Sequence, residues 1–106
     1  MLNVDKNVDG EKVIFTLDGS FDKLSTEKFE QLVISAVSPF MKKKKMNVIF
    51  DCSQLKYLGI AGIKSFLKMR KFISMLNGSL TIKSANDNIK NIFEKTDLYS
   101  GFVFSE

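Results

Sequence analysis

The amino-acid sequence predicts an α/β domain in which helices pack against a mixed sheet of four or five strands. Two observations predict this class. Short runs rich in β-branched and aromatic residues alternate along the chain with longer stretches whose apolar residues recur every three or four positions. The chain has 106 residues, 44% of them apolar, which is enough for one domain with its own core. We therefore expect a single domain over residues 1–106.

The chain opens with a predicted β-hairpin. Residues 11–18, EKVIFTLD, form an apolar run that is typical of a strand, and Leu2 and Val4 belong to a strand before it. Asp9-Gly10 between the two strands favours a tight turn. We therefore expect these two strands to pair antiparallel.

A first helix is predicted between residues 25 and 40. Ser25 is a suitable N-cap, and Leu24 and Phe29 have the spacing of a hydrophobic staple around it. Pro39 should end or distort the helix near Ser38, with a short extension through Met41 as the alternative. One apolar stripe carries this prediction: Phe29, Leu32, Val33, Ala36, Val37 and Phe40.

The next two elements are a strand and a long helix. The run MNVIFDCS, residues 46–53, predicts a central strand that is buried on both faces. A broad apolar face over residues 60–76 predicts the helix, and Asn77-Gly78 should end it.

The remaining elements complete the alternation. Residues 79–84 are expected to form a strand, and residues 86–96 a short helix capped by Asn86 or Ser84. Residues 102–104 are expected to add an edge strand. The resulting order, β-β-α-β-α-β-α-β, favours a mostly parallel sheet with an antiparallel hairpin partner.

Composition excludes several kinds of chemistry. The chain has no histidine, so Ser-His and Cys-His catalysis and most zinc sites are excluded. Cys52 is the only cysteine and lies in an apolar run, so we expect a buried thiol and a reducing, cytoplasmic setting. The first ten residues lack the apolar core of a signal peptide, and no run is long enough to span a membrane.

The net charge of +4 raises the question of nucleic-acid binding. Four consecutive lysines, residues 42–45, are the main basic cluster, and a solvated loop explains them more simply than a phosphate-binding patch. No aromatic residues are interleaved with basic ones as in RNA-binding motifs. We therefore expect no nucleic-acid partner.

Candidate acidic sites are equally sparse. Asp18, Asp22 and Asp51 could converge at strand ends and hold Mg²⁺, but ordinary strand-end carboxylates explain them better. Glu27 and Glu30 are expected on a solvated helix face, where nothing tunes them for acid–base work. We expect no metal, no cofactor and no enzymatic activity.

The stretch YLGIAGIKSF, residues 57–66, joins a strand to the long helix without any side chain that could cap the helix. The spacing Gly59-x-x-Gly62 only faintly matches a phosphate-binding loop, because Lys64-Ser65 follows too late. The turn therefore shows no chemistry of its own.

The order of short motifs around this turn resembles that of STAS domains, the fold of bacterial anti-sigma factor antagonists. Those domains read a strand with Asp-hydrophobe-Ser, an aromatic–aliphatic pair, and then Asp-Ser-Ser/Thr-Gly-Leu at the start of a long helix. The corresponding segments here are residues 48–53 (VIFDCS), Tyr57-Leu58 and Gly62-Ile63, with further similarity at residues 17–22 (LDGSFD), 77–80 (NGSL) and 91–98 (NIFEKTDL).

The resemblance implies partner binding. In the sigma-regulating members, an unphosphorylated antagonist captures a kinase-type anti-sigma factor, and phosphorylation of the serine at the helix start separates the two. This chain departs from that pattern, because Gly59 stands for the Asp, Ile60 for the first Ser and Ala61 for the residue that receives phosphate. The counterpart of the upstream acid, Asp22, is retained.

By this resemblance we expect a regulatory protein-interaction module that is not switched by phosphorylation at Ala61. Its partner could be a kinase-type anti-sigma factor. An accessory subunit of a lipid-transport or signalling-scaffold complex is the alternative, and the turn is either a docking patch or simply packed. The oligomeric state stays open. The expected partner-binding residues are Asp22, Gly59, Ile60, Ala61, Gly62, Lys64 and Ser65.

Overall fold

A computed structural model describes residues 1–40, 46–96 and 101–106 and confirms the predicted α/β class and element order. Two short 3₁₀ turns, η1 and η2, flank the first helix. In chain order the elements are β1 (Leu2–Asp9), β2 (Lys12–Phe21), η1 (Lys23–Ser25), α1 (Thr26–Val37), η2 (Ser38–Phe40), β3 (Asn47–Leu58), α2 (Ile60–Met75), β4 (Ser79–Lys83), α3 (Asp87–Lys95) and β5 (Val103–Ser105).

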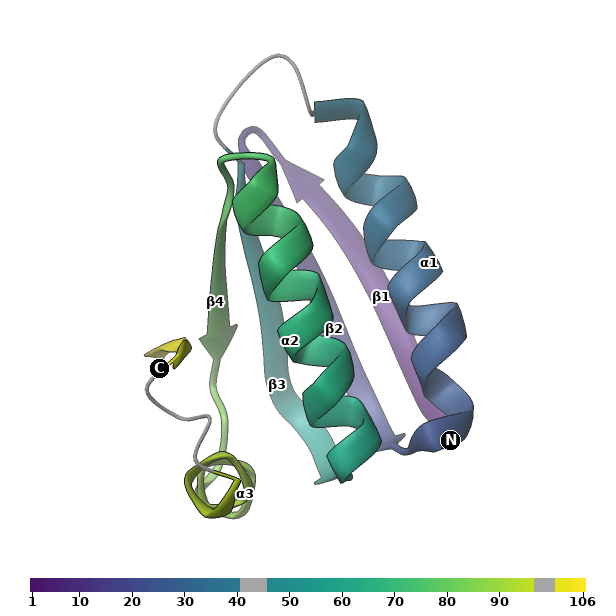
Figure 1. Cartoon of the computed structure of the whole chain (residues 1–106), viewed down its shortest axis with the longest axis vertical. Coiled ribbons are helices and arrows are strands. Elements are labelled where there is room, and N and C mark those ends of the chain that lie inside the picture. Colours follow the sequence, from purple (N-terminus) through teal and green to yellow (C-terminus); the bar gives the residue numbers. More distant parts are fainter. Residues whose placement is uncertain (41–45, 97–100) are drawn as a thin grey trace.

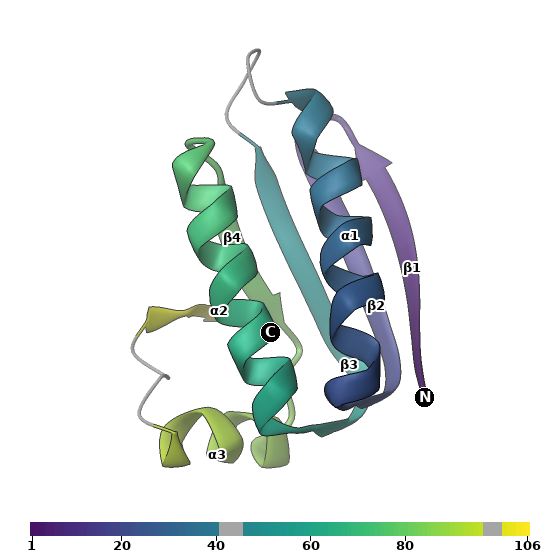
Figure 2. The same cartoon turned by 45° about the vertical axis from the view of Figure 1, so that its right-hand side comes forward.

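The five strands form one mixed sheet in the order β1-β2-β3-β4-β5. β1 pairs antiparallel with β2 through the predicted hairpin, and the other neighbours pair in parallel. α1 and α2 lie side by side across the same face of the sheet (Figures 1 and 2). α3 lies near the edge of the sheet at which α2 begins.

β3 is the central strand, as predicted, but the prediction that both of its faces are buried is wrong. Val48, Phe50 and Cys52 point toward the helices and are fully buried. Ile49 and Asp51 alternate with them on the opposite face, where they are only partly buried. The opposite face stays accessible because α1 and α2 cover only one side.

β2 and β3 extend further than predicted, by three and five residues, because an irregular stretch keeps them paired. Their register shifts twice, between Thr16 and Asp18 and again between Gly19 and Ser20. Gly19 has a φ of +103°, and the Met1 carbonyl comes so close that no side chain would fit there. This extension carries Phe21 and Leu58 to the point where α2 starts.

The start of α1 differs from the prediction. Ser25 precedes the helix, but its side chain does not cap it, and Leu24 is 93% exposed instead of packing against Phe29 as a staple. Asp22 forms the local bonds, because its Oδ1 accepts from the Leu24 amide (3.1 Å) and from the Ser25 hydroxyl (3.3 Å). The chain therefore enters α1 through η1, which leaves Leu24 on the surface.

The helix stripe itself is confirmed where the structure describes it, since Phe29, Val33, Ala36 and Val37 are buried and Leu32 packs against the core while partly buried. The side chain of Phe40, the proposed extension through Met41 and the lysine run 42–45 lie outside the described residues.

The predicted ends of α2 and α3 are confirmed. Asn77 takes a φ of +61° after α2, and the amides of Asn77 and Gly78 donate to the Ser74 and Ile73 carbonyls, as in a Schellman motif. Asn86 caps α3, because its side-chain oxygen accepts from the Ile89 amide at 3.0 Å.

A connected group of phenylalanine rings forms the centre of the core. The centroids of neighbouring rings are 4.8 to 6.1 Å apart, mostly edge-to-face or tilted. The rings come from β2, α1, β3, α2 and α3, in that order: Phe21, Phe29, Phe50, Phe66 and Phe93. The core therefore extends to the base of the turn that begins α2.

Candidate functional site

The first residues of α2 lie at the edge of the sheet where β2 and β3 end (Figures 1 and 2). The Gly59 amide donates to the carbonyl of Phe21, the last residue of β2, at 2.9 Å. The Gly59 carbonyl in turn accepts from the Ile63 amide at 3.1 Å, which closes the first turn of the helix. Backbone bonds therefore tie the start of α2 to the neighbouring strand.

No side chain caps α2. Gly59 holds the N-cap position with φ −81° and ψ 173°, a conformation open to any residue. A Cβ added to Gly59 would lie 3.3 Å from atoms of the Tyr57 ring, so the ring of Tyr57 occupies the space beside it. The lack of a polar cap is thus a property of the side chains present and not a demand of the backbone.

Gly62 has a structural role one turn into the helix. A Cβ at Gly62 would lie 2.6 Å from Leu58 Cδ1 and 2.9 Å from Phe21 Cδ1. Both neighbours are fully buried. Gly62 therefore allows the first turn of α2 to sit directly on the ends of β2 and β3, and it offers no side chain to a partner.

The outer surface of this region is apolar. Ile60 is 65% exposed, Tyr57 is 53% exposed, and Leu24 projects from η1, which packs beside α2. Ala61 is half-buried and Lys64 is exposed. We call this set, Asp22, Leu24, Tyr57, Gly59, Ile60, Ala61 and Lys64, the turn surface.

Ser65 does not belong to the turn surface, although the resemblance placed it among the partner-binding residues. Only 1% of Ser65 is exposed, and its hydroxyl donates to Glu30 Oε2 at 2.7 Å. Lys68 Nζ lies 3.3 Å from the other Glu30 oxygen. Ser65 therefore joins α2 to α1 beneath the surface.

Glu30 also differs from its prediction, because it does not lie on a solvated face. Its side chain is 18% exposed and bonds two residues of α2. The contact between Glu30 and Ser65 spans 35 residues of sequence, so no local pattern could have predicted it. The helical position of Ser65, between the apolar Gly62 and Phe66, was the one available signal that it faces inward.

Two of the three candidate carboxylates, Asp22 and Asp51, have ordinary local bonds. Asp22 is bonded within its own turn, and Asp51 Oδ1 accepts from the Ser53 amide at 3.0 Å. Across residues 1–40, 46–96 and 101–106, no three His, Cys, Asp or Glu side chains come together as metal ligands would.

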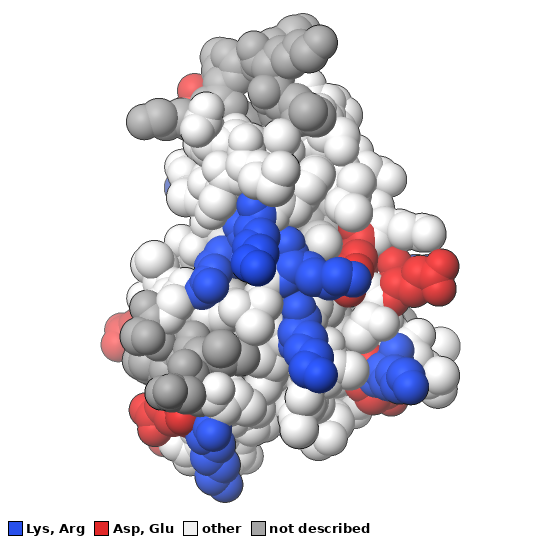
Figure 3. Space-filling model, viewed as in Figure 1, with Lys and Arg blue, Asp and Glu red and all other residues white. Residues whose placement is uncertain are grey.

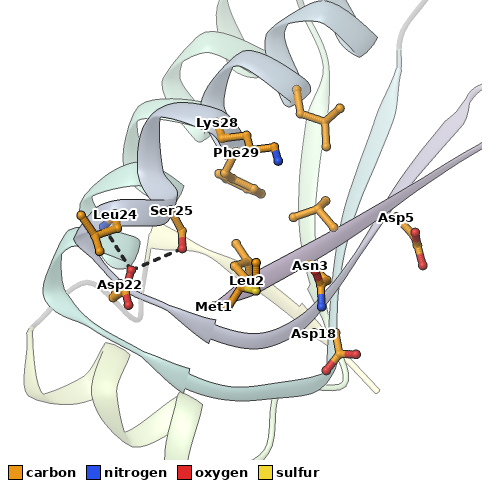
Figure 4. Close-up of a pocket in the computed structure, with 12 residues that line it drawn as sticks. Met1, Leu2, Asn3, Asp5, Asp18, Asp22, Leu24, Ser25, Lys28 and Phe29 are labelled. Atoms are coloured by element: carbon orange, nitrogen blue, oxygen red, sulfur yellow. Dashed lines mark hydrogen bonds between the residues drawn. The ribbon is translucent and has the colours of Figure 1, made fainter.

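A groove of about 890 Å³ adjoins the turn surface between β1 and α1. Phe29 points from α1 toward Leu2 of β1, and Asp22 lies at one end with its bonds to Leu24 and Ser25 (Figure 4). Asp5, Asp18 and Lys28 also line the groove, so it combines an apolar floor with a polar margin. It extends the accessible surface around Asp22.

Cys52 is buried, as predicted. Burial, with a smaller contribution from the charge of Asp51, raises the pKa of its thiol to about 12. The thiol is therefore protonated at neutral pH and is a poor nucleophile.

These features define a small α/β domain whose second helix begins at the surface without a polar cap. The sequence pattern of the STAS domain matches residues 3–106. The chain belongs to the STAS domain family.

Solved structures with the same fold include an anti-sigma factor antagonist from Mycobacterium paratuberculosis. It has a TM-score of 0.83 at 14% identity over 99% of this chain and 86% of that one. The anti-sigma factor antagonist SpoIIAA of Bacillus, in its unphosphorylated form, has a TM-score of 0.74 at 14% identity, over 100% of this chain and 88% of its own. A murine anion transporter also contains the fold, with a TM-score of 0.68 at 18% identity, over 80% of this chain but 14% of the transporter.

The two anti-sigma factor antagonists are thus matched over 86% and 88% of their own length, and the transporter over 14% of its length. No curated protein sequence matches the chain significantly. Within the described ranges, no helix has the length and apolar character needed to cross a membrane.

Proposed function

We propose that this chain is a non-catalytic regulatory module of the cytoplasm that binds a protein partner through the turn surface. The observation that carries this proposal is the exposure of Leu24, Tyr57 and Ile60 together at one edge of the sheet. Single exposed apolar residues are common on soluble proteins, whereas neighbouring ones mark contact surfaces.

The turn surface lies on a rigid base, which supports a binding function. Phe21 and Leu58 are fully buried below it, and Gly62 lets the helix pack closely on both. A surface that is held in one conformation loses little conformational entropy on binding. The helix start can therefore meet a partner without rearrangement.

The phosphorylation switch of the family is absent from the proposed surface. SpoIIAA has been solved in phosphorylated and unphosphorylated forms. In this chain Ala61 stands at the corresponding position, and its methyl group cannot accept phosphate. We infer that binding at this surface is not released by phosphorylation at residue 61.

The partner we propose is a kinase-type anti-sigma factor, by analogy with the antagonists that share the fold. The test is titration calorimetry of the purified chain with anti-sigma kinases encoded in the same genome. Ala61→Asp places a charge on the contact and should weaken binding by about tenfold or more, whereas Ala61→Ser should change it little. Asn7→Asp, exposed near the β1–β2 turn, adds the same charge at the opposite end of the sheet and is the matched control.

The complex should persist when ATP is added. Equal affinity of the Ala61→Asp variant and the wild type would show that the partner docks elsewhere. Release of the wild-type chain by ATP would contradict the loss of the switch.

A further inference from the structure

The outward side of α2 forms one continuous ridge. Its residues follow one another at intervals of four, four, three and four positions, which keeps them on a single side of a helix. The ridge is about 22 Å long, from 15 residue steps of about 1.5 Å each. We call this set, Ile60, Lys64, Lys68, Lys71 and Met75, the α2 ridge.

The two ends of the α2 ridge are apolar and its middle is basic. Met75 is 82% exposed, and Ile60 at the other end belongs also to the turn surface. Lys64, Lys68 and Lys71 between them are all exposed.

The charge of α2 is unbalanced. The helix carries four basic residues and no acidic one. Lys68 is paired with Glu30, while Lys64 and Lys71 have no acidic partner among the described residues. Lysine and arginine side chains gather along the middle of this face, over α2 (Figure 3).

The fourth basic residue of α2 has a different role. Arg70 turns toward the C-terminal segment, where its guanidinium donates to the Gly101 carbonyl and lies 4.6 Å from the centroid of the Phe102 ring. Arg70 therefore holds the fold together, and the charge free for a partner is that of Lys64 and Lys71.

We infer that the α2 ridge binds an acidic protein surface, with carboxylates opposite the lysines and apolar contacts at both ends. This inference rests on the proposed function, because Ile60 and Lys64 belong to both surfaces. Charge complementarity carries it, since unpaired lysines along one ridge attract an acidic patch and raise the rate of encounter.

The pattern fits a protein better than a membrane or a nucleic acid. A helix that lies on a bilayer presents a continuous apolar face, whereas the apolar face of α2 is buried against the sheet. Nucleic acid would use the lysines but would leave Ile60 and Met75 without partners. An acidic surface with flanking apolar residues uses the whole ridge.

The test uses a synthetic helical peptide of 18 residues with glutamates spaced to face the three lysines and a leucine near each end. Fluorescence anisotropy measures its binding to the full chain at low salt. The Lys64→Glu/Lys71→Glu variant should bind it at least about tenfold more weakly. The Lys6→Glu/Lys12→Glu variant makes the same change in net charge on the exposed hairpin and should stay within about twofold of wild type.

The apolar ends are tested separately. Ile60→Ser/Met75→Ser should weaken binding of the peptide severalfold and leave the salt dependence of binding unchanged, because no charge is removed. The inference would be overturned if Lys64→Glu/Lys71→Glu and Lys6→Glu/Lys12→Glu lost peptide affinity equally. It would also be overturned if the wild type did not bind the peptide at about 1 mM. Tighter binding to anionic vesicles or duplex DNA than to the peptide, lost with the same lysines, would also overturn it.

These results are independent of the titration with anti-sigma kinases. A chain that binds the peptide but no such kinase keeps the acidic-surface inference and loses the proposed function. A chain that binds a kinase with unchanged affinity in a Lys71→Glu/Met75→Ser variant, which leaves the turn surface intact, keeps the proposed function and loses the inference.

Discussion

The starts of α2 and α3 are held in opposite ways. The first turn of α3 is capped by the side chain of Asn86, which accepts from the Ile89 amide, and Asp87 places a negative charge near the positive end of the helix. The first turn of α2 has neither a side-chain cap nor an acidic residue. The start of α3 is thus specified by its own residues.

The start of α2 is specified by the rest of the fold. The Phe21 carbonyl accepts from the Gly59 amide, and Gly62 rests on Phe21 and Leu58. Because packing from below holds this turn, its outward side chains have no capping role. That separation leaves Ile60 and Ala61 available to a partner.

Removal of the Phe21 side chain should have the largest effect on the start of α2. Phe21→Ala should lower the free energy of unfolding by about 3–5 kcal/mol, because it deletes a fully buried ring below α2. Urea denaturation measures this loss, and hydrogen exchange should show the Ile63 amide losing more protection than the Ile89 amide. Ile34→Ala, at a site on α1 that is 38% exposed, is the control and should cost under about 1 kcal/mol. Equal loss of protection at both helix starts would contradict the difference between them.

Gly62→Ala is expected to have the next largest effect. Alanine favours helices over glycine by about 1 kcal/mol, but here its Cβ would collide with Leu58 and Phe21, so we expect a net destabilisation of about 1–3 kcal/mol. Ser74→Ala, exposed later in the same helix, is the control and should leave stability unchanged or slightly raised. If Gly62→Ala stabilised the protein in urea denaturation, α2 would not pack as closely on the ends of β2 and β3 as described.

Asn86→Ala tests whether the side chain of Asn86 stabilises the start of α3. Loss of the cap should cost about 1 kcal/mol, measured by urea denaturation. Asn88→Ala makes the same chemical change at an exposed position within α3 and should cost little. The interpretation of α3 as a locally capped helix would not survive equal effects of the two variants.

Gly59→Ser should have the smallest effect. A serine would supply the missing cap, but glycine is only a few tenths of a kcal/mol worse at this position, and the Tyr57 ring must shift slightly to admit the new Cβ. We expect a change of under about 0.5 kcal/mol in thermal or urea denaturation. Gly59→Ala, which adds the Cβ without the hydroxyl, isolates the cap itself. If Gly59→Ser raised the free energy of unfolding by more than about 1 kcal/mol, the missing side-chain cap would limit the stability of α2.

Features with a local cause were predictable from the sequence. Asn77-Gly78 ends α2 and Asn86 caps α3, because both depend on residues adjacent in the chain. The burial of Cys52 followed from its apolar run. The position of the uncapped turn between β3 and α2 was predictable because the spacing of apolar residues changes there from that of a strand to that of a helix.

Features that depend on distant partners were not predictable. The register shifts around Gly19 lengthen β2 and β3 through pairing that no single strand encodes. Leu24 has the spacing of a staple, yet Asp22 takes over the local bonds and leaves it exposed. Ser65 was expected at the surface because its partner, Glu30, lies on another helix.

The burial of Cys52 offers a way to measure how often the sheet opens. It is the only thiol of the chain and lies at the centre of the sheet, where no reagent reaches it in the closed state. Labelling then proceeds only through opening of the sheet, and its rate reports how often β3 becomes accessible. The chain thus carries its own kinetic probe of opening, which needs a thiol reagent but no engineered residue.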